Sequence, residues 1–146
     1  MSDQPNLTGA TQAIEVAAGL VFRGGKLLIS RRRAQDHLGG LWEFPGGKRE
    51  HGETFEVCLR RELQEELGVT VEVGALLETI THDYPGKRVL LRFFRCRLAA
   101  AEPEPRPLGC AAVTWVSVAE LSRYDFPAAD ARLLACLSSD VGLWED

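Results

Sequence analysis

An amphipathic helix is the element that most constrains the fold of this chain. Thr54 is a residue type that caps helix N-termini, and Gly68 suits the left-handed position just past a helix C-terminus. Apolar residues recur at every fourth position between them: Phe55, Leu59, Leu63 and Leu67. This period predicts a helix with one apolar face, and that face must pack against the rest of the protein.

The same helix carries a cluster of carboxylates. Glu62, Glu65 and Glu66 stand at i, i+3 and i+4, so their side chains rise from one face. Like charges at this spacing cost about 0.2–0.5 kcal/mol per pair in an isolated helix. A divalent cation reverses the sign of that interaction, so the cluster favours a metal site. The alternative is a solvated acidic face, which leaves the paired glycines upstream unexplained.

Those glycines, Gly46 and Gly47, let the backbone turn tightly and approach a ligand closely. Magnesium prefers oxygen ligands in octahedral geometry, and two or three carboxylates with substrate phosphates complete its shell. Glu62 and Glu66 fit this role best because they flank the apolar stripe. The sequence contains neither an EF-hand loop nor a phosphate-binding Gly-Lys-Ser/Thr loop, which excludes two other classes of site.

The length of 146 residues predicts one domain, over residues 12–146, preceded by a flexible N-terminal tail over residues 1–11. No apolar stretch approaches membrane-spanning length, and we expect a cytoplasmic protein without a membrane partner. The four cysteines are scattered and are expected to be buried thiols. The protein is expected to be a monomer or a homodimer.

A net charge of −4 argues against a partner that is a nucleic acid polymer, since such binding depends on neutralising phosphates. An anionic small substrate would need local positive charge. Arg31-Arg32-Arg33 and Lys87-Arg88 can provide it, although each is equally compatible with a solvated basic turn.

Outside the helix, short strands dominate. Residues 13–22 and 26–30 read as a hairpin, residues 41–44 as a short strand, and residues 69–81 and 88–98 as two strands that pair antiparallel. Residues 113–116 form another strand, and helices are expected over residues 118–123 and 128–137. This pattern predicts an α/β (α+β) fold in which helices pack on a mixed β-sheet.

The sequence resembles that of a known protein family. Residues 47–69 match the signature of the Nudix hydrolases at every defined position, and residues 41–48 and Phe126-Pro127 are similar to the MutT-like nucleoside triphosphate pyrophosphohydrolases of that family. The resemblance implies a mixed sheet in an α/β/α sandwich. It also implies Mg²⁺-dependent hydrolysis, with Mn²⁺ as a substitute, of a (deoxy)nucleoside triphosphate to nucleoside monophosphate and pyrophosphate.

The resemblance also implies residue roles. The metal ligands would be Glu62, Glu65, Glu66 and the Gly46 carbonyl, while Arg61 and Glu53 would form the pair that supports catalysis. Arg32 would contact substrate phosphate. Lys87 and His37 are further candidates for phosphate contact, and Phe44 is a candidate for stacking on a base, although an aromatic residue on a strand is more often part of the core.

One position departs from the family pattern. MutT-like enzymes carry an additional glutamate six residues before a tryptophan, and counting back from Trp115 gives Gly109. Glu102 and Glu104 in the same loop are candidate substitutes if the loop folds back over the site. Glu65 is the other candidate for a general base, and the sequence leaves the assignment open.

Asp130 occupies the position at which a MutT relative has an asparagine that hydrogen-bonds the substrate base. An ionised carboxylate only accepts hydrogen bonds, so it suits the two donors of guanine or 8-oxoguanine, whereas a protonated one can read cytosine. Alternatively, Asp130 only places a favourable charge in the first turn of a helix.

Three functions remain open at this stage. The first is a nucleoside triphosphate pyrophosphohydrolase that removes oxidised or modified dNTPs. The second is an ADP-ribose or nucleotide-sugar pyrophosphatase, and the third is a noncatalytic nucleotide-binding module.

Overall fold

A computed structural model of the protein describes residues 13–99 and 101–145. The expected tail at residues 1–11 lies outside these ranges. Seven strands, two α-helices and three 3₁₀ turns follow one another along the described residues: β1 (Ala13–Arg23), β2 (Lys26–Arg31), β3 (Trp42–Glu43), β4 (Gly46–Lys48), α1 (Phe55–Leu67), β5 (Val71–Tyr84), β6 (Lys87–Leu98), β7 (Ala112–Val116), η1 (Leu121–Arg123), η2 (Ala128–Asp130), α2 (Ala131–Ser139) and η3 (Val141–Trp144).

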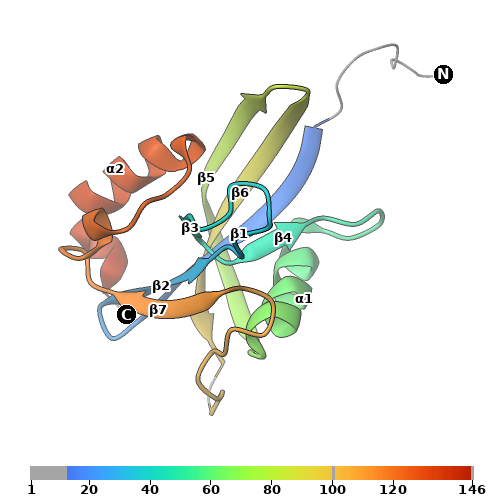
Figure 1. Ribbon diagram of the computed structural model, residues 1–146. Helices are drawn as coiled ribbons and strands as arrows, with labels where there is room; N and C mark the ends of the chain where they lie inside the picture. Colours follow the sequence, from blue (N-terminus) through green and yellow to red (C-terminus); the bar gives the residue numbers. More distant parts are fainter. Residues whose placement is uncertain (1–12, 100, 146) are drawn as a thin grey trace.

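Strand β1 organises a mixed sheet with the order β3-β2-β1-β6-β5, in which β4 also pairs with β1 and β7 with β2. β1 runs parallel to β6 from the pair Ala13↔Arg88 to the pair Val21↔Cys96. It runs antiparallel to both β2 and β4. The predicted β1–β2 hairpin and the antiparallel β5–β6 pair are therefore confirmed. Figure 1 shows the two helices on opposite sides of this sheet, so the fold is the expected mixed sheet with helices packed on it.

Helix α1 forms because its ends and its apolar face agree with its sequence. The Thr54 hydroxyl accepts a hydrogen bond from Val57 N at 3.1 Å, and Gly68 adopts φ 70° beyond the last turn. Leu59, Leu63 and Leu67 are fully buried against one face of the sheet, in a cluster with Val21 and Phe94 among others. The packing of this face fixes the helix, and with it the glutamates that the helix carries.

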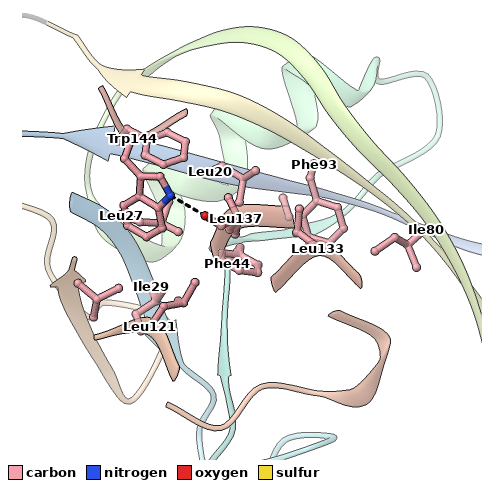
Figure 2. Close-up of a cluster of buried hydrophobic side chains, with 13 residues drawn as sticks. Leu20, Leu27, Ile29, Phe44, Ile80, Phe93, Leu121, Leu133, Leu137 and Trp144 are labelled. Atoms are coloured by element: carbon pink, nitrogen blue, oxygen red, sulfur yellow. Dashed lines mark hydrogen bonds between the residues drawn. The ribbon is translucent and has the colours of Figure 1, made fainter. Parts of the chain in front are cut away.

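Helix α2 covers the opposite face of the sheet. Leu133 and Leu137 of α2 pack in a second buried cluster with Leu20, Phe93 and other apolar side chains (Figure 2). The Trp144 indole in η3 donates a hydrogen bond to the carbonyl of Leu137 at 3.0 Å, which closes this cluster at the C-terminal end. Each face of the sheet therefore has its own core.

Three elements differ from the expectation. Gly46–Lys48 is a strand, β4, because Gly46 and Gly47 pair with Ala18 and Ala17 instead of only ending the preceding strand. The helix predicted at residues 118–123 is a single 3₁₀ turn at Leu121–Arg123. The turn η3 had no counterpart in the sequence analysis.

Strand β5 lies at the edge of the sheet and is interrupted by irregularities in register between Val73 and Glu78. Arg132 of α2 reaches this edge: it pairs with Glu78 at 2.9 Å and donates to the carbonyl of Thr79 at 3.2 Å. Part of the open backbone of the edge strand is thus already bonded by a side chain.

None of the helices within the described part of the chain is long and apolar enough to cross a membrane.

We predict that Leu63→Ala will lower the free energy of unfolding by about 2–5 kcal/mol, because it removes a fully buried side chain and leaves a cavity between α1 and the sheet. Urea unfolding followed by circular dichroism measures the change. Val57→Ala on the same helix is the control, because Val57 is 44% exposed and its loss should change stability little. Equal effects of the two substitutions would contradict this packing of α1.

Candidate active site

A cleft with a volume of about 680 Å³ lies beside β1, β6 and β4. The N-terminal half of β1 and the β5–β6 hairpin form one wall, and α1 closes one end. Charged residues from several separate segments line it, including Arg32, Glu43, Lys48, Glu62, Glu66, Lys87 and Asp130. The fold therefore brings residues that are far apart in the sequence into one concave site, which is the usual form of a small-molecule site.

The two glycines of β4 allow its close contacts. A methyl group on Gly46 would overlap the carbonyl of Ala17 on β1, and a methyl group on Gly47 would overlap the carboxyl group of Glu62. Because neither position has room for a side chain, the Glu62 carboxylate lies directly against the backbone of β4. The sequence analysis predicted that the paired glycines let the backbone approach a ligand closely. In the structure, the group that lies against Gly47 is the Glu62 carboxylate.

Arg61 forms the expected pair with Glu53. Its guanidinium makes two hydrogen bonds to the Glu53 carboxylate, at 2.6 and 2.9 Å, and donates a third to the carbonyl of Lys48 at 3.1 Å. The hydrogen bonds from Arg61 lower the pKa of Glu53 to about 2. Arg61 also contacts Glu62 at 3.0 Å. It therefore ties the loop before α1 to the first of the cleft carboxylates, and its role in catalysis remains a prediction.

The three glutamates of the cluster lie in different surroundings. Glu62 and Glu66 line the cleft, whereas the Glu65 side chain is 59% exposed and contacts Arg61 at 3.4 Å. Burial raises the pKa of Glu62 and, with the nearby charges of Glu43 and Glu62, raises the pKa of Glu66 to about 8. Glu65 thus lies at the rim of the site, where its assignments as ligand and base remain predictions.

These residues fit a divalent cation in part. Over residues 13–99 and 101–145, no three His, Cys, Asp or Glu side chains converge closely enough to hold a metal by themselves. However, Glu66 Oε1 is buried and has no hydrogen-bond partner in that part of the chain. An unpaired carboxylate oxygen beside a second carboxylate is a donor set that suits a hard cation, with substrate phosphates completing its shell.

Glu43 is a site residue that the sequence analysis missed. It accepts a hydrogen bond from Arg32 at 2.7 Å, and the Arg32 Nε donates to the carbonyl of His37 at 2.6 Å. Burial raises the pKa of Glu43, although Arg32 opposes this effect. The signal for Glu43 in the sequence was its charge, because it stands between Trp42 and Phe44 in an otherwise apolar strand. Arg32 is thus held in the cleft by a carboxylate and by the loop that carries His37.

The far end of the cleft combines an acid with aromatic rings. Asp130 is only 6% exposed, burial raises its pKa to about 7, and its side chain makes no capping hydrogen bond to α2. Phe44 is buried and stacked on Phe126 at 5.0 Å between ring centroids, so it forms part of the core as well as of the cleft. Asp130 directly precedes α2 as its N-cap residue, so its role as a charge at the start of the helix and its role in base binding both remain predictions.

His37 and Lys87 both line the cleft beside the ring of Tyr84. The His37 ring contacts Tyr84 edge-on at 5.3 Å, and the Lys87 ammonium lies 5.9 Å from the centroid of the same ring. Both side chains line the cleft, so contact with a substrate remains a prediction for each.

The loop before β7 does not deliver a carboxylate to the site. Glu102 accepts a hydrogen bond from Thr70 N at 2.5 Å, and Glu104 pairs with Arg23 at 2.7 Å. Neither side chain lines the cleft. The expectation that either one could substitute for a glutamate at Gly109 is therefore wrong, because each is already paired elsewhere on the surface.

The chain is similar to known proteins over most of its length. The NUDIX domain family matches residues 17–136 of the chain. The chain is 34% identical over 128 residues to an 8-oxo-dGTP diphosphatase of Escherichia coli, covering 85% of this chain and 95% of that protein. It is 36% identical over 126 residues to a CTP pyrophosphohydrolase of Escherichia coli, covering 83% and 88%.

Solved structures agree with these relatives. The solution structure of the E. coli ORF135 protein aligns with a TM-score of 0.75 and 32% identity, covering 92% of this chain and 96% of that chain. A MutT structure from methicillin-resistant Staphylococcus aureus aligns with a TM-score of 0.72 and 29% identity, covering 90% and 99%.

We predict that the metal-free protein becomes less stable as the pH rises from about 5 to about 8. The pKa of Glu66 is raised to about 8 and that of Asp130 to about 7, so both groups bind protons more tightly in the folded state than in the unfolded state. Their contribution is fully present below the unfolded pKa values and is lost as the pH rises through the folded values. Urea unfolding with a chelator across this pH range measures the effect.

Glu66→Gln should flatten this pH dependence because it removes one of the two groups. Glu56→Gln, at an exposed position of the same helix, should leave it unchanged. A steep dependence that persists in Glu66→Gln would show that Glu66 is not the group responsible.

Proposed function

Because this chain belongs to the NUDIX domain family, we propose that it is an enzyme that hydrolyses a (deoxy)nucleoside triphosphate to nucleoside monophosphate and pyrophosphate, with Mg²⁺ as cofactor and Mn²⁺ as a substitute. The observation that carries this proposal is the composition of one cleft. Glu62, Glu66, the glycines of β4, Arg32 and the buried Asp130 all line this cleft. We propose that Glu62, Glu66 and β4 bind the cation and that Asp130 binds the base. The names of the relatives, 8-oxo-dGTP diphosphatase and CTP pyrophosphohydrolase, agree with such a substrate.

Glu62 and Glu66 would hold the cation, with the Gly46 carbonyl and Glu65 as the further ligands proposed from the family. The bound cation would lower the pKa of a water molecule and neutralise charge that develops on the phosphates. Arg61 would keep Glu62 in place, because it bonds Glu62 and Glu53 at once. Arg32 would bind phosphate, and Lys87 and His37 would add positive charge and a hydrogen-bond donor.

Asp130 would determine which nucleotide base the site binds. An ionised carboxylate accepts hydrogen bonds from N1–H and the exocyclic amine of guanine or 8-oxoguanine, whereas a protonated one can donate to cytosine. Because burial brings the pKa of Asp130 to about 7, both forms exist near neutral pH. This supports a preference that includes guanine and cytosine nucleotides. Removal of oxidised or modified dNTPs, in the cytoplasm where these nucleotides are held, is the role we propose.

A nucleotide panel with Mg²⁺ tests the reaction class: GTP, 8-oxo-dGTP, CTP, 5-methyl-dCTP and ADP-ribose. We expect pyrophosphate from the triphosphates and little turnover of ADP-ribose. Release of AMP from ADP-ribose at a higher rate than release of pyrophosphate from the triphosphates would favour an ADP-ribose or nucleotide-sugar pyrophosphatase. Binding without any turnover would favour a noncatalytic module. Either result would contradict the proposal.

Glu66→Gln should lower kcat by at least about 100-fold, as expected for loss of a group that acts on the charge of the transition state. Its fold should be retained, because the substitution keeps the shape of the side chain and removes repulsion with Glu43 and Glu62. Steady-state pyrophosphate release measures the rate, with Glu56→Gln on the same helix as the matched control. Full activity in Glu66→Gln would exclude the proposed metal role.

Asp130 gives a second prediction, about specificity. The ratio of kcat/KM for GTP to that for CTP should rise between about pH 6 and about pH 8.5 as Asp130 ionises. Ionisation of Glu66 affects both substrates alike and cancels in this ratio. Asp130→Asn should remove the pH dependence of the ratio and raise KM for GTP by about 10- to 100-fold, the effect of losing a hydrogen bond to a charged group. A ratio that changes with pH equally in Asp130→Asn would contradict base reading by Asp130.

A further inference from the structure

The loop between Arg106 and Cys110 is bonded to the last turn of α1. The amide nitrogens of Leu108 and Gly109 both donate to the carbonyl of Glu66, at 2.9 and 3.0 Å. Arg106 N donates to the carbonyl of Leu67 at 3.0 Å. The last carbonyls of a helix have no partners within the helix, so this loop provides them. It holds Glu66, which has a buried carboxylate oxygen without a hydrogen-bond partner within the described chain.

Gly109 also touches the side chain of Glu66. A Cβ atom built on Gly109 would lie 3.1 Å from Glu66 Cγ, 3.2 Å from its Cα and 3.4 Å from its Cβ. The first two distances are shorter than ordinary van der Waals contact, so any side chain at residue 109 would press on the stem of Glu66. The glutamate stem is therefore confined on this side by bare backbone, and its carboxylate lies in the cleft.

The other end of the same loop is fixed to the segment that carries Arg32. Ala111 N donates to the carbonyl of Arg31 at 2.8 Å, and the Arg33 guanidinium donates to the carbonyl of Leu108 at 3.2 Å. The loop is thus bonded to α1 on one side and to residues 31–33 on the other, so a shift of Gly109 away from Glu66 would lengthen these hydrogen bonds.

We propose that Gly109 is a positioning residue for Glu66: the absence of a side chain there lets the loop cap α1 while the Glu66 carboxylate keeps the orientation that binds the cation. The inference rests on the proposed function. It also offers a reason why residue 109 is a glycine here, where the MutT-like enzymes carry a glutamate. The alternative is that Gly109 is a position where a useful carboxylate has been lost, in which case adding one should improve the site.

Gly109→Ala and Gly109→Glu distinguish the two ideas. Mn²⁺ binding to the otherwise native protein, measured by electron paramagnetic resonance without nucleotide, is the first readout. The second is kcat and KM for the best nucleotide of the panel, and the third is the melting temperature. Gly142→Ala is the control, because a Cβ atom there would meet only Asp140 Oδ1, at an ordinary 3.5 Å.

We expect Gly109→Ala to weaken Mn²⁺ binding and to lower kcat by about 10- to 100-fold, the usual effect of disturbing a group that orients a ligand, with KM changed little. Gly109→Glu should be at least as impaired, and Gly142→Ala should match the wild type. Both Gly109 variants should melt within a few degrees of the wild type, because a displaced glutamate stem leaves the two hydrophobic cores intact.

Three results would overturn the inference: wild-type Mn²⁺ affinity in Gly109→Ala, tighter Mn²⁺ binding or faster turnover in Gly109→Glu, or failure of both variants to fold. The result for Gly109 can be distinguished from the result for the proposed reaction. If the wild type hydrolyses no nucleotide but Gly109→Ala still weakens Mn²⁺ binding, the proposed reaction fails and the positioning role stands.

Discussion

Helix α1 packs against bare backbone at two places, and the rest of the site depends on this close packing. Gly47 of β4 lies against the Glu62 carboxyl group, and Gly109 lies against the stem of Glu66. Each glycine comes from a different segment. Because no flexible side chain separates the helix from these segments, the positions of its two cleft carboxylates are set by main-chain geometry, which varies much less than side-chain conformation.

This packing carries an electrostatic cost that the surrounding fold has to offset. Glu43, Glu66 and Asp130 are three acidic groups in one cleft, and burial raises the pKa of each. Arg32 pairs with only one of them, and Arg61 is engaged with Glu53 and Glu62. The stability comes from elsewhere, chiefly from the fully buried leucines of α1 and the second hydrophobic cluster on the opposite face of the sheet. Functional sites commonly hold such unfavourable groups in place by the packing around them.

The sequence predicted the parts of this arrangement that depend on local spacing. Helix α1 with both its caps and the Arg61–Glu53 pair follow from residues that lie close together in the sequence, in α1 and the loop before it. The spacing also predicted that the three glutamates share one site, but Glu65 is 59% exposed and only Glu62 and Glu66 line the cleft. The sequence did not predict the strand β4, which exists only because Gly46 and Gly47 find a partner in β1. Glu43 was missed for the same reason: its burial depends on Arg32 and on segments distant in the chain.

The loop before β7 shows most clearly what local spacing in the sequence could not predict. The partners of Glu102 and Glu104 are Thr70 and Arg23, which no spacing rule relates to them. Contacts of this kind are set by the path of the whole chain, so they appear only once the fold is known.

The outer edge of β5 has a consequence of a different kind. A long edge strand offers unpaired backbone groups to any neighbouring molecule, and pairing of such edges is a common route to aggregation. Here the irregular register between Val73 and Glu78 bends that edge, and Arg132 occupies the carbonyl of Thr79. A single side chain of α2 therefore links the packing of that helix to the solubility of the protein: a change that lets α2 come away from the sheet would also uncover an edge on which copies of the chain can associate.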